Sequence, residues 1–166
     1  MMSEAVVRFP PGTVVRLVRN VRNDGSFTDL RKGELLVAAG TEGIIRTYGY
    51  WLQTQVIYQV FFPDVQRVIG IREAEVIDAG LEWVPCRFRV GDKARLRYTL
   101  TMQSRCLSRK GEMVDIHRVH RDLDTGQLKY EIILEGLHFH LEDKVLSTLE
   151  SCADIELVAQ GSEEEV

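Results

Sequence analysis

Apolar and polar residues alternate along several short segments of the chain, and this alternation predicts β-strands. The segments are residues 56–62 (VIYQVFF), 93–100 (KARLRYTL) and 129–135 (KYEIILE). The inward positions are Val56, Tyr58, Val60 and Phe62 in the first, Ala94, Leu96, Tyr98 and Leu100 in the second, and Tyr130, Ile132 and Leu134 in the third. The best helix candidate is Leu141 to Cys152, where Val145, Leu149 and Cys152 recur at helical spacing.

The two halves of the sequence resemble each other, which indicates an internal duplication. Residues 9–17 (FPPGTVVRL) match residues 88–96 (FRVGDKARL) in Phe, Gly, Arg and Leu at equal spacings, and YQVFF matches YEIIL. A period near 75 residues is too long for a solenoid. We therefore expect two tandem copies of one small fold, residues 9–80 and 87–158, with a linker at 78–87 and flexible ends at 1–8 and 159–166.

Each copy offers about five short strands separated by glycine turns, which favours an all-β fold of small closed barrels. An SH3-like barrel fits this order of strands best. The first long loop of each copy, residues 20–39 and 101–110, is the expected place for binding residues because the strands are occupied with packing.

Composition and charge narrow the class of protein. Hydrophobic residues make up 45% of the 166, enough for a core. The longest apolar runs, such as residues 35–39, are far shorter than the roughly 20 residues of a membrane span, and no signal peptide is recognisable, so a cytoplasmic location is the default. Residues 1–129 carry 20 basic and 15 acidic residues, whereas residues 130–166 carry 1 and 10. The mildly basic part permits an acidic partner.

Neither the cysteines nor any recognisable catalytic motif indicates a chemical activity. Cys86, Cys106 and Cys152 are widely spaced, so neither a disulfide framework nor a self-sufficient zinc or iron–sulfur site is expected, and buried or partly buried free thiols are the simplest interpretation. There is no nucleophile motif and no phosphate-binding glycine loop. We expect no enzymatic activity and no cofactor.

Residues 19–25 (RNVRNDG) form a polar segment at the end of an expected strand. Asp24 and Gly25 predict a turn, because the aspartate can bond its own backbone and glycine accepts positive φ. Arg19 and Arg22 then lie at the root of the long loop, where guanidinium groups could bind carboxylates of a partner. The alternative is that Asn20, Asn23 and Asp24 only stabilise the loop while the arginines are solvated.

Four segments form a recognisable series: residues 19–27 (RNVRNDGSF), 33–46 (GELLVAAGTEGIIR), 51–62 (WLQTQVIYQVFF) and 69–79 (IGIREAEVIDA). In their order and spacing they resemble the NifZ family of nitrogen-fixation accessory proteins, and WVPCRF at 83–88 resembles the family's junction. The resemblance covers residues 9–90 well and is weaker over residues 91–158. It implies a non-catalytic factor that binds the immature nitrogenase molybdenum–iron protein and assists P-cluster maturation, working with the nitrogenase iron protein.

Carried over by motif, the resemblance also implies which residues recognise the partner. They are Arg19, Asn20, Arg22, Asn23, Asp24, Gly25, Gln53, Gln55, Arg72 and Glu73. The chain departs from the family pattern at Ile71, where a cysteine is expected. A thiol contact to a cluster at this position is therefore not predicted.

Two histidine pairs are the only candidates for metal binding, and they are weak ones. His138 and His140 would share a strand face about 7 Å apart, whereas His117 and His120 would point to opposite faces. The pairs could meet across a barrel, but no carboxylate or thiol is in register with them. Polar surface histidines are the favoured interpretation.

The alternative function is an RNA- or ribosome-binding module of the SH3-like or KOW type. The basic excess over residues 1–129 and the aromatic residues Tyr48, Tyr50 and Trp51 favour it. The sequence pI of 5.6 is far below the value of about 9 that is typical of such modules. We therefore expect no nucleic acid among the partners.

Overall fold

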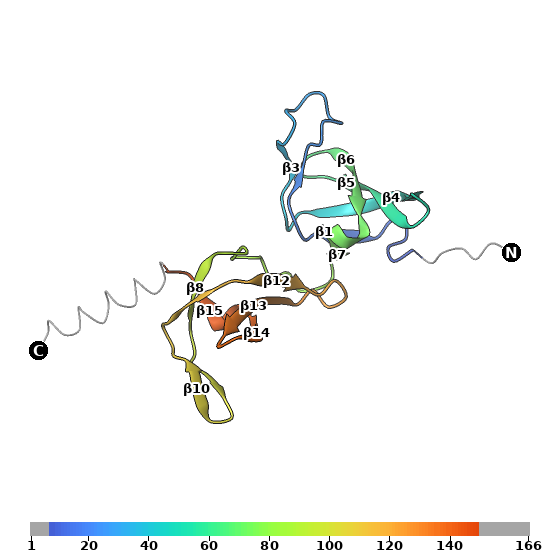
Figure 1. Cartoon of the computed structure of the whole chain (residues 1–166). Coiled ribbons are helices and arrows are strands. Elements are labelled where there is room, and N and C mark those ends of the chain that lie inside the picture. The colour runs from blue at the N-terminus through green and yellow to red at the C-terminus, as the bar shows by residue number, and fades with distance from the viewer. Residues whose placement is uncertain (1–6, 150–166) are drawn as a thin grey trace, which may run out of the picture. The chain divides into compact units, whose positions relative to one another are not determined.

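The computed structural model describes residues 7–149 and divides the chain into two compact units. The first contains the described residues up to Trp83 together with Leu123–Gly126, and the second contains Val84–Asp122 and the described residues from Gln127 onward. Both units consist of strands, so the all-β fold class is confirmed (Figure 1). No helix in the described part of the chain is long and apolar enough to cross a membrane.

The first unit is built on one antiparallel sheet of five strands in the order β6-β5-β4-β1-β7, with a separate two-stranded ladder of β2 and β3. A single turn of 3-10 helix, η1, joins β6 to β7. The elements are β1 (Val14–Leu17), β2 (Val21–Arg22), β3 (Leu35–Val37), β4 (Glu42–Trp51), β5 (Gln55–Phe62), β6 (Arg67–Arg72), η1 (Glu73–Glu75) and β7 (Val76–Asp78).

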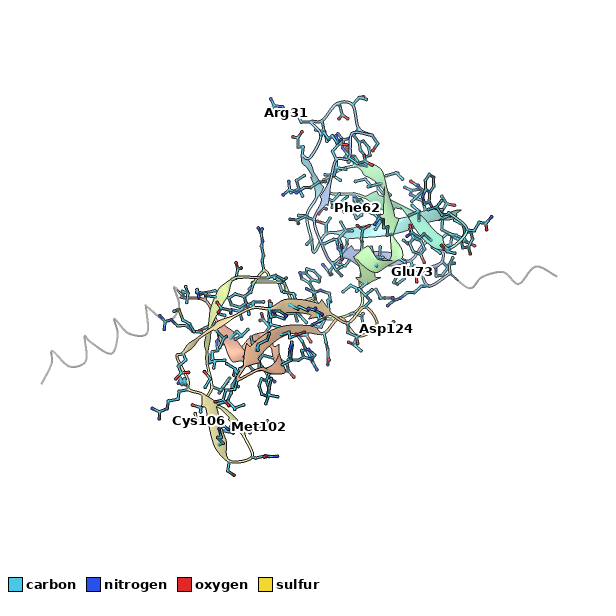
Figure 2. The ribbon with its side chains drawn as sticks, viewed as in Figure 1. Arg31, Phe62, Glu73, Met102, Cys106 and Asp124 are labelled. Atoms are coloured by element: carbon cyan, nitrogen blue, oxygen red, sulfur yellow. The ribbon has the colours of Figure 1, made fainter. Side chains whose placement is uncertain are left out.

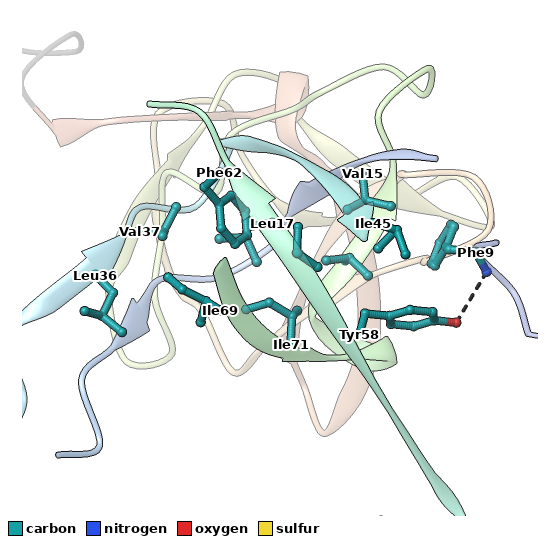
Figure 3. Close-up of a cluster of buried hydrophobic side chains, with 12 residues drawn as sticks. Phe9, Val15, Leu17, Leu36, Val37, Ile45, Tyr58, Phe62, Ile69 and Ile71 are labelled. Carbon is teal, nitrogen blue, oxygen red and sulfur yellow. Dashed lines mark hydrogen bonds between the residues drawn. The ribbon is translucent and has the colours of Figure 1, made fainter. Parts of the chain in front are cut away.

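The core of the first unit follows the predicted alternation of β5. Tyr58, Val60 and Phe62 are fully buried, and Figure 3 shows Tyr58 and Phe62 among the other core side chains. Gly43, on the neighbouring β4, leaves room for them: a Cβ there would lie 2.5 Å from Cγ1 of Val60. Ile71 on β6, the position where the resemblance leads us to expect a cysteine, is also fully buried and belongs to the core in this chain.

The second unit consists of three small antiparallel sheets, β11-β8-β15, β12-β13-β14 and β10-β9. A second 3-10 turn, η2, precedes the last strand. The elements are β8 (Lys93–Leu96), β9 (Leu100–Met102), β10 (Arg105–Ser108), β11 (Met113–Asp115), β12 (Arg118–Arg121), β13 (Leu128–Leu134), β14 (Leu137–Glu142), η2 (Asp143–Val145) and β15 (Leu146–Ser147).

Two predictions for the second unit are wrong, and a third is only partly right. β8 ends at Leu96, so Tyr98 is 58% exposed instead of facing the core, and residues 101–110 form the β9–β10 hairpin rather than a long loop. No continuous helix begins at residue 141, because residues 141–147 form the end of β14, the turn η2 and β15; η2 is the helical turn that we expected near this end of the chain as the alternative to a short helix. Leu146 is fully buried because β15 pairs with β8, an interaction that helical spacing cannot indicate. Cys152 lies outside the described residues.

The two units repeat one core contact. In the first, the hydroxyl of Tyr58 accepts a hydrogen bond from the backbone N–H of Phe9, and the two rings are 5.8 Å apart. In the second, the hydroxyl of Tyr130 accepts from the N–H of Arg87, and the ring of Phe88 is 5.3 Å from that of Tyr130. A duplication would produce such pairs. The ladders among the described residues close no barrel, however, so the tandem SH3-like barrels and the duplication stay predictions from the sequence.

Candidate functional site

The loop between β2 and β3, residues 23–34, is held together by one buried side chain. Asn23 is 2% exposed. Its Nδ2 donates to the carbonyl oxygens of Phe27, Leu30 and Arg31 at 2.8, 3.1 and 3.2 Å, and its Oδ1 accepts from the N–H groups of Gly25 and Phe27 at 3.0 and 3.2 Å. An amide can satisfy several backbone groups at once, so this side chain fixes the loop without any regular strand or helix.

Two further residues of the predicted recognition segment stabilise the β2–β3 hairpin, Asp24 within its loop and Asn20 at its open end. Oδ1 of Asp24 accepts hydrogen bonds from the backbone N–H and the hydroxyl of Ser26, at 3.0 and 2.7 Å. These bonds lower the pKa of the Asp24 carboxyl. Oδ1 of Asn20 accepts from the N–H of Ala39 at 2.8 Å. The asparagines and the aspartate therefore have the stabilising role that the sequence left open as one alternative.

The arginines of this segment are exposed beside the ordered loop. Nη1 of Arg22 donates to the carbonyl of Gly33 at 3.1 Å, which directs its guanidinium along the loop. Among the described residues, the side chain of Arg19 makes no hydrogen bond or ion pair. Arg16, which lies on β1 three residues before Arg19, is instead paired with Glu42 at 2.6 Å. Arg19 and Arg22 are thus the residues of the segment whose charges are available to a partner.

The other predicted recognition residues lie on or beside the five-stranded sheet, at the end that is farther from this loop. Gln53 and Gln55 are exposed at the tip of the β4–β5 hairpin, and Arg72 is exposed opposite Ile57 on β5. The loop contacts the other end of β5–β6, where Asp29 pairs with Arg67 at 2.5 Å. β5 has eight residues, from Gln55 to Phe62, and its ends are therefore roughly 23 Å apart along the extended chain.

One of these residues has a structural role. Oε2 of Glu73 accepts a hydrogen bond from the hydroxyl of the buried Tyr58 at 3.0 Å. Figure 2 shows Arg31 of the loop and Glu73 at opposite ends of the first unit, with Phe62 between them. The ten predicted residues therefore form two separate groups rather than one site.

All four histidines of the chain gather around one carboxylate in the second unit. Glu131, in the middle strand β13, is 5% exposed although it lies on the polar face of the sheet. Nε2 of His120 lies 3.0 Å from its Oε2, Nε2 of His140 lies 3.4 Å from the same oxygen, and Nδ1 of His138 lies 2.6 Å from Oε1. These hydrogen bonds, that of His120 first, lower the pKa of Glu131 from 4.5 to about 2.

The histidines contribute two groups of potential metal ligands that share this carboxylate. One is His117, Glu131 and His138, the other is His120, Glu131 and His140, and in each group the ligand atoms lie within 4.8 Å of one another. The sequence-based prediction that no carboxylate accompanies the histidines is therefore wrong. His117 precedes β12 rather than belonging to it, which is why it does not point away from His120 as expected.

The two described cysteines are not part of this cluster. Cys86 and Cys106 are both exposed free thiols, which contradicts the expectation that they are buried or partly buried. Sγ of Cys86 lies 3.0 Å from the carbonyl oxygen of Phe88. Cys106 lies on β10 and is labelled in Figure 2 on the β9–β10 hairpin.

Comparison with known proteins identifies the family. A family model for the NifZ domain matches residues 6–78. Protein NifZ of Azotobacter vinelandii is 36% identical over 155 residues, which are 93% of this chain and 98% of that protein. Protein NifZ of Klebsiella pneumoniae is 30% identical over 138 residues, 82% of this chain and 90% of that protein. No solved structure matches the chain. With relatives of this identity aligned over nearly their whole length, the chain belongs to the NifZ family of nitrogen-fixation accessory proteins.

Proposed function

We propose that this protein binds the immature nitrogenase molybdenum–iron protein and assists maturation of its P-clusters, acting beside the nitrogenase iron protein and catalysing no reaction itself. Family membership supports the accessory role. The observation that carries the proposal is the ordered β2–β3 loop, in which Asn23 fixes the backbone and Arg19 and Arg22 are exposed beside it.

An ordered loop favours docking because less conformational entropy is lost when it binds. Arginine presents a planar set of N–H donors that fits a carboxylate in two parallel hydrogen bonds. Arg19 is the better placed of the two for this role, since its side chain has no hydrogen bond or ion pair to give up within the described residues. We therefore place acidic side chains of the client opposite this loop.

The proposed task is a physical one. Binding must favour the client conformation in which the immature clusters can be reduced and completed, and a ligand shifts such an equilibrium only by its difference in affinity between the two states. The factor must accordingly bind the immature client more tightly than the finished protein, or release would fail.

The experiment is capture of cluster-deficient molybdenum–iron protein by the immobilised full-length chain. We expect Arg19→Glu with Arg22→Glu to abolish capture, and Arg19→Glu alone to weaken it clearly. The matched control is Arg97→Glu with Arg109→Glu, which changes the same charge at exposed positions of the second unit. Equal capture by both double variants and the unmodified protein would refute the assignment of this loop.

A second candidate function, binding of single-stranded RNA, is favoured by the aromatic residues at the end of β4. Tyr48, Tyr50 and Trp51 are exposed to 37%, 49% and 61%, and bases could stack on such rings. The acidic pI of 5.6 opposes it. Salt dependence separates this function from protein docking, because binding to nucleic acid weakens steeply as the salt concentration rises.

A further inference from the structure

The polar face of the sheet β12-β13-β14 brings together three side chains that could bind one metal ion. Glu131 lies in the middle strand, and His120 and His140 belong to the two outer strands, so both imidazoles reach the same carboxylate oxygen from opposite sides. The two imidazole rings have centroids 5.3 Å apart. Residues from three strands of one sheet are positioned more rigidly than residues of a loop, which suits a metal site.

The distances match those of a tetrahedral site. With metal–ligand bonds of 2.0–2.1 Å, two ligands of a tetrahedral ion are about 3.3 Å apart. The observed distances from Oε2 of Glu131 are 3.0 Å to Nε2 of His120 and 3.4 Å to Nε2 of His140. An imidazole that carries its N–H on Nδ1 has a lone pair on Nε2, and it can offer that lone pair to an ion.

We propose that His120, Glu131 and His140 bind one divalent transition-metal ion of the Zn²⁺ type. Two imidazoles and a carboxylate are ligands that zinc and non-haem iron share, and sites of this kind keep positions open for water or another ligand. The side chains of His120 and His140 are 48% and 54% exposed, so an ion can enter from solvent. This site is independent of the docking function proposed above.

The other two histidines of the cluster, His138 and His117, do not bind the proposed ion, and their roles differ. Nδ1 of His138, 2.6 Å from Oε1, holds the carboxylate oxygen that the ion does not use. Such outer contacts orient a ligating carboxylate, and their loss typically weakens metal binding by 10- to 100-fold. His117 packs on the ring of His138, 5.7 Å away, and contributes no ligand to the proposed ion.

The test is Zn²⁺ binding by the untagged full-length protein, measured by equilibrium dialysis with elemental analysis, and with Co²⁺ as a spectroscopic probe of the ligands. We expect one ion per chain at micromolar free Zn²⁺ and no binding of Mg²⁺, which avoids imidazole. His120→Ala, His140→Ala and Glu131→Gln should each weaken binding more than about 100-fold, His138→Ala by 10- to 100-fold, and His117→Ala hardly at all. Circular dichroism of the metal-free variants checks that they remain folded.

Three results would overturn the proposal. The first is less than one ion bound by the unmodified chain at micromolar Zn²⁺, which would make Glu131 a carboxylate satisfied by its histidines alone. The second is loss of binding in His117→Ala with retention in His120→Ala, which would assign the ion to the other group. The third is equal weak binding by every folded variant, which exposed histidines produce without a built site.

Discussion

Replacing Asn23 with alanine should destabilise the first unit while leaving its core intact. The side chain is almost fully buried, and its amide makes five hydrogen bonds to backbone groups between Gly25 and Arg31. Nδ2 has two hydrogens for three carbonyls, so one of these donors is shared. Alanine removes all of these bonds and offers no polar atom in return.

The expected loss is about 2–3 kcal/mol. Two donated and two accepted hydrogen bonds at a net value of about 1 kcal/mol each set an upper figure of roughly 4 kcal/mol. Gly25 and Arg31 are exposed and can bond to water once the side chain is gone, which reduces the figure. Asn20→Ala is the matched control: it removes a single bond, to the exposed Ala39, and should cost about 1 kcal/mol or less.

Urea unfolding followed by tryptophan fluorescence measures this loss in the correct unit. The chain contains two tryptophans, Trp51 and Trp83, and both belong to the first unit. The fluorescence transition therefore reports that unit even where the second unfolds separately. We expect a lower free energy of unfolding with an unchanged slope against urea, because the surface buried by the core is the same.

A loss in Asn23→Ala no larger than that in Asn20→Ala would refute this reasoning. It would mean that the loop's backbone groups exchange the amide for water at no cost, so that the loop is not ordered before it binds. The docking proposal would then lose the feature that carries it. If the expected loss is observed, capture of the client by Asn23→Ala should also weaken although both arginines are present.

Three further predictions concern packing, pH and nucleic acid. Gly43→Ala should destabilise the first unit by about 1–3 kcal/mol in the same urea assay, because its Cβ would meet Val60 at 2.5 Å, whereas Gly49→Ala, with no atom within 4 Å, should stay within about 0.5 kcal/mol. Because the pKa of Glu131 is lowered from 4.5 to about 2, its stabilising contribution should be complete above pH 4.5 and disappear as the pH falls to 2; a carboxyl ¹³C titration midpoint near 4.5 would contradict this. Single-stranded RNA should not be retained even at about 50 mM salt, and retention that falls steeply by about 200 mM would instead favour the RNA-binding alternative.

The period-two pattern predicted β5 and β13 correctly, because each of these strands packs one face against the core. Most of the residues expected to face inward in β5 and β13 are fully buried, whereas Val56 and Leu134, near the ends of these strands, are only partly buried. The same pattern failed at Tyr98, because alternation in a sequence does not show where the backbone leaves the sheet. The end of β8 depends on its pairing partners β11 and β15, which lie far away in the sequence.

The β2–β3 loop could be predicted only in part. The Asp-Gly pair indicated a turn, and the local composition indicated side chains that bond to the backbone. Which of the two asparagines becomes buried is decided by carbonyl groups four to eight residues further along, at Phe27, Leu30 and Arg31. A local pattern contains no information on where those carbonyls point, so Asn20 and Asn23 were equivalent in the sequence.

The histidine cluster was missed for a related reason. Alternation in residues 129–135 correctly put Glu131 on the outward face, and His138 and His140 were expected to share a face. The sequence does not show the register in which Glu131 lies opposite His140 on β14. It also does not show that β12 pairs with the other edge of β13. The outward face of a middle strand is covered by side chains from both neighbours, so an outward carboxylate there can be almost fully buried.

The two candidate sites should respond to different changes in solution. The loop is fixed by a neutral amide bonded to backbone groups, and none of its contacts requires a titrating side chain with a pKa near neutrality. The cluster depends on the ionised carboxylate of Glu131 and on the imidazoles around it. Protons and metal ions compete for such groups. A chelator at neutral pH should therefore remove the proposed ion from the second unit. Client capture through Arg19 and Arg22 should be unchanged. Loss of capture on chelation, restored by Zn²⁺ in the unmodified chain but not in His120→Ala, would show that the cluster takes part in docking and that the loop alone is not the binding surface.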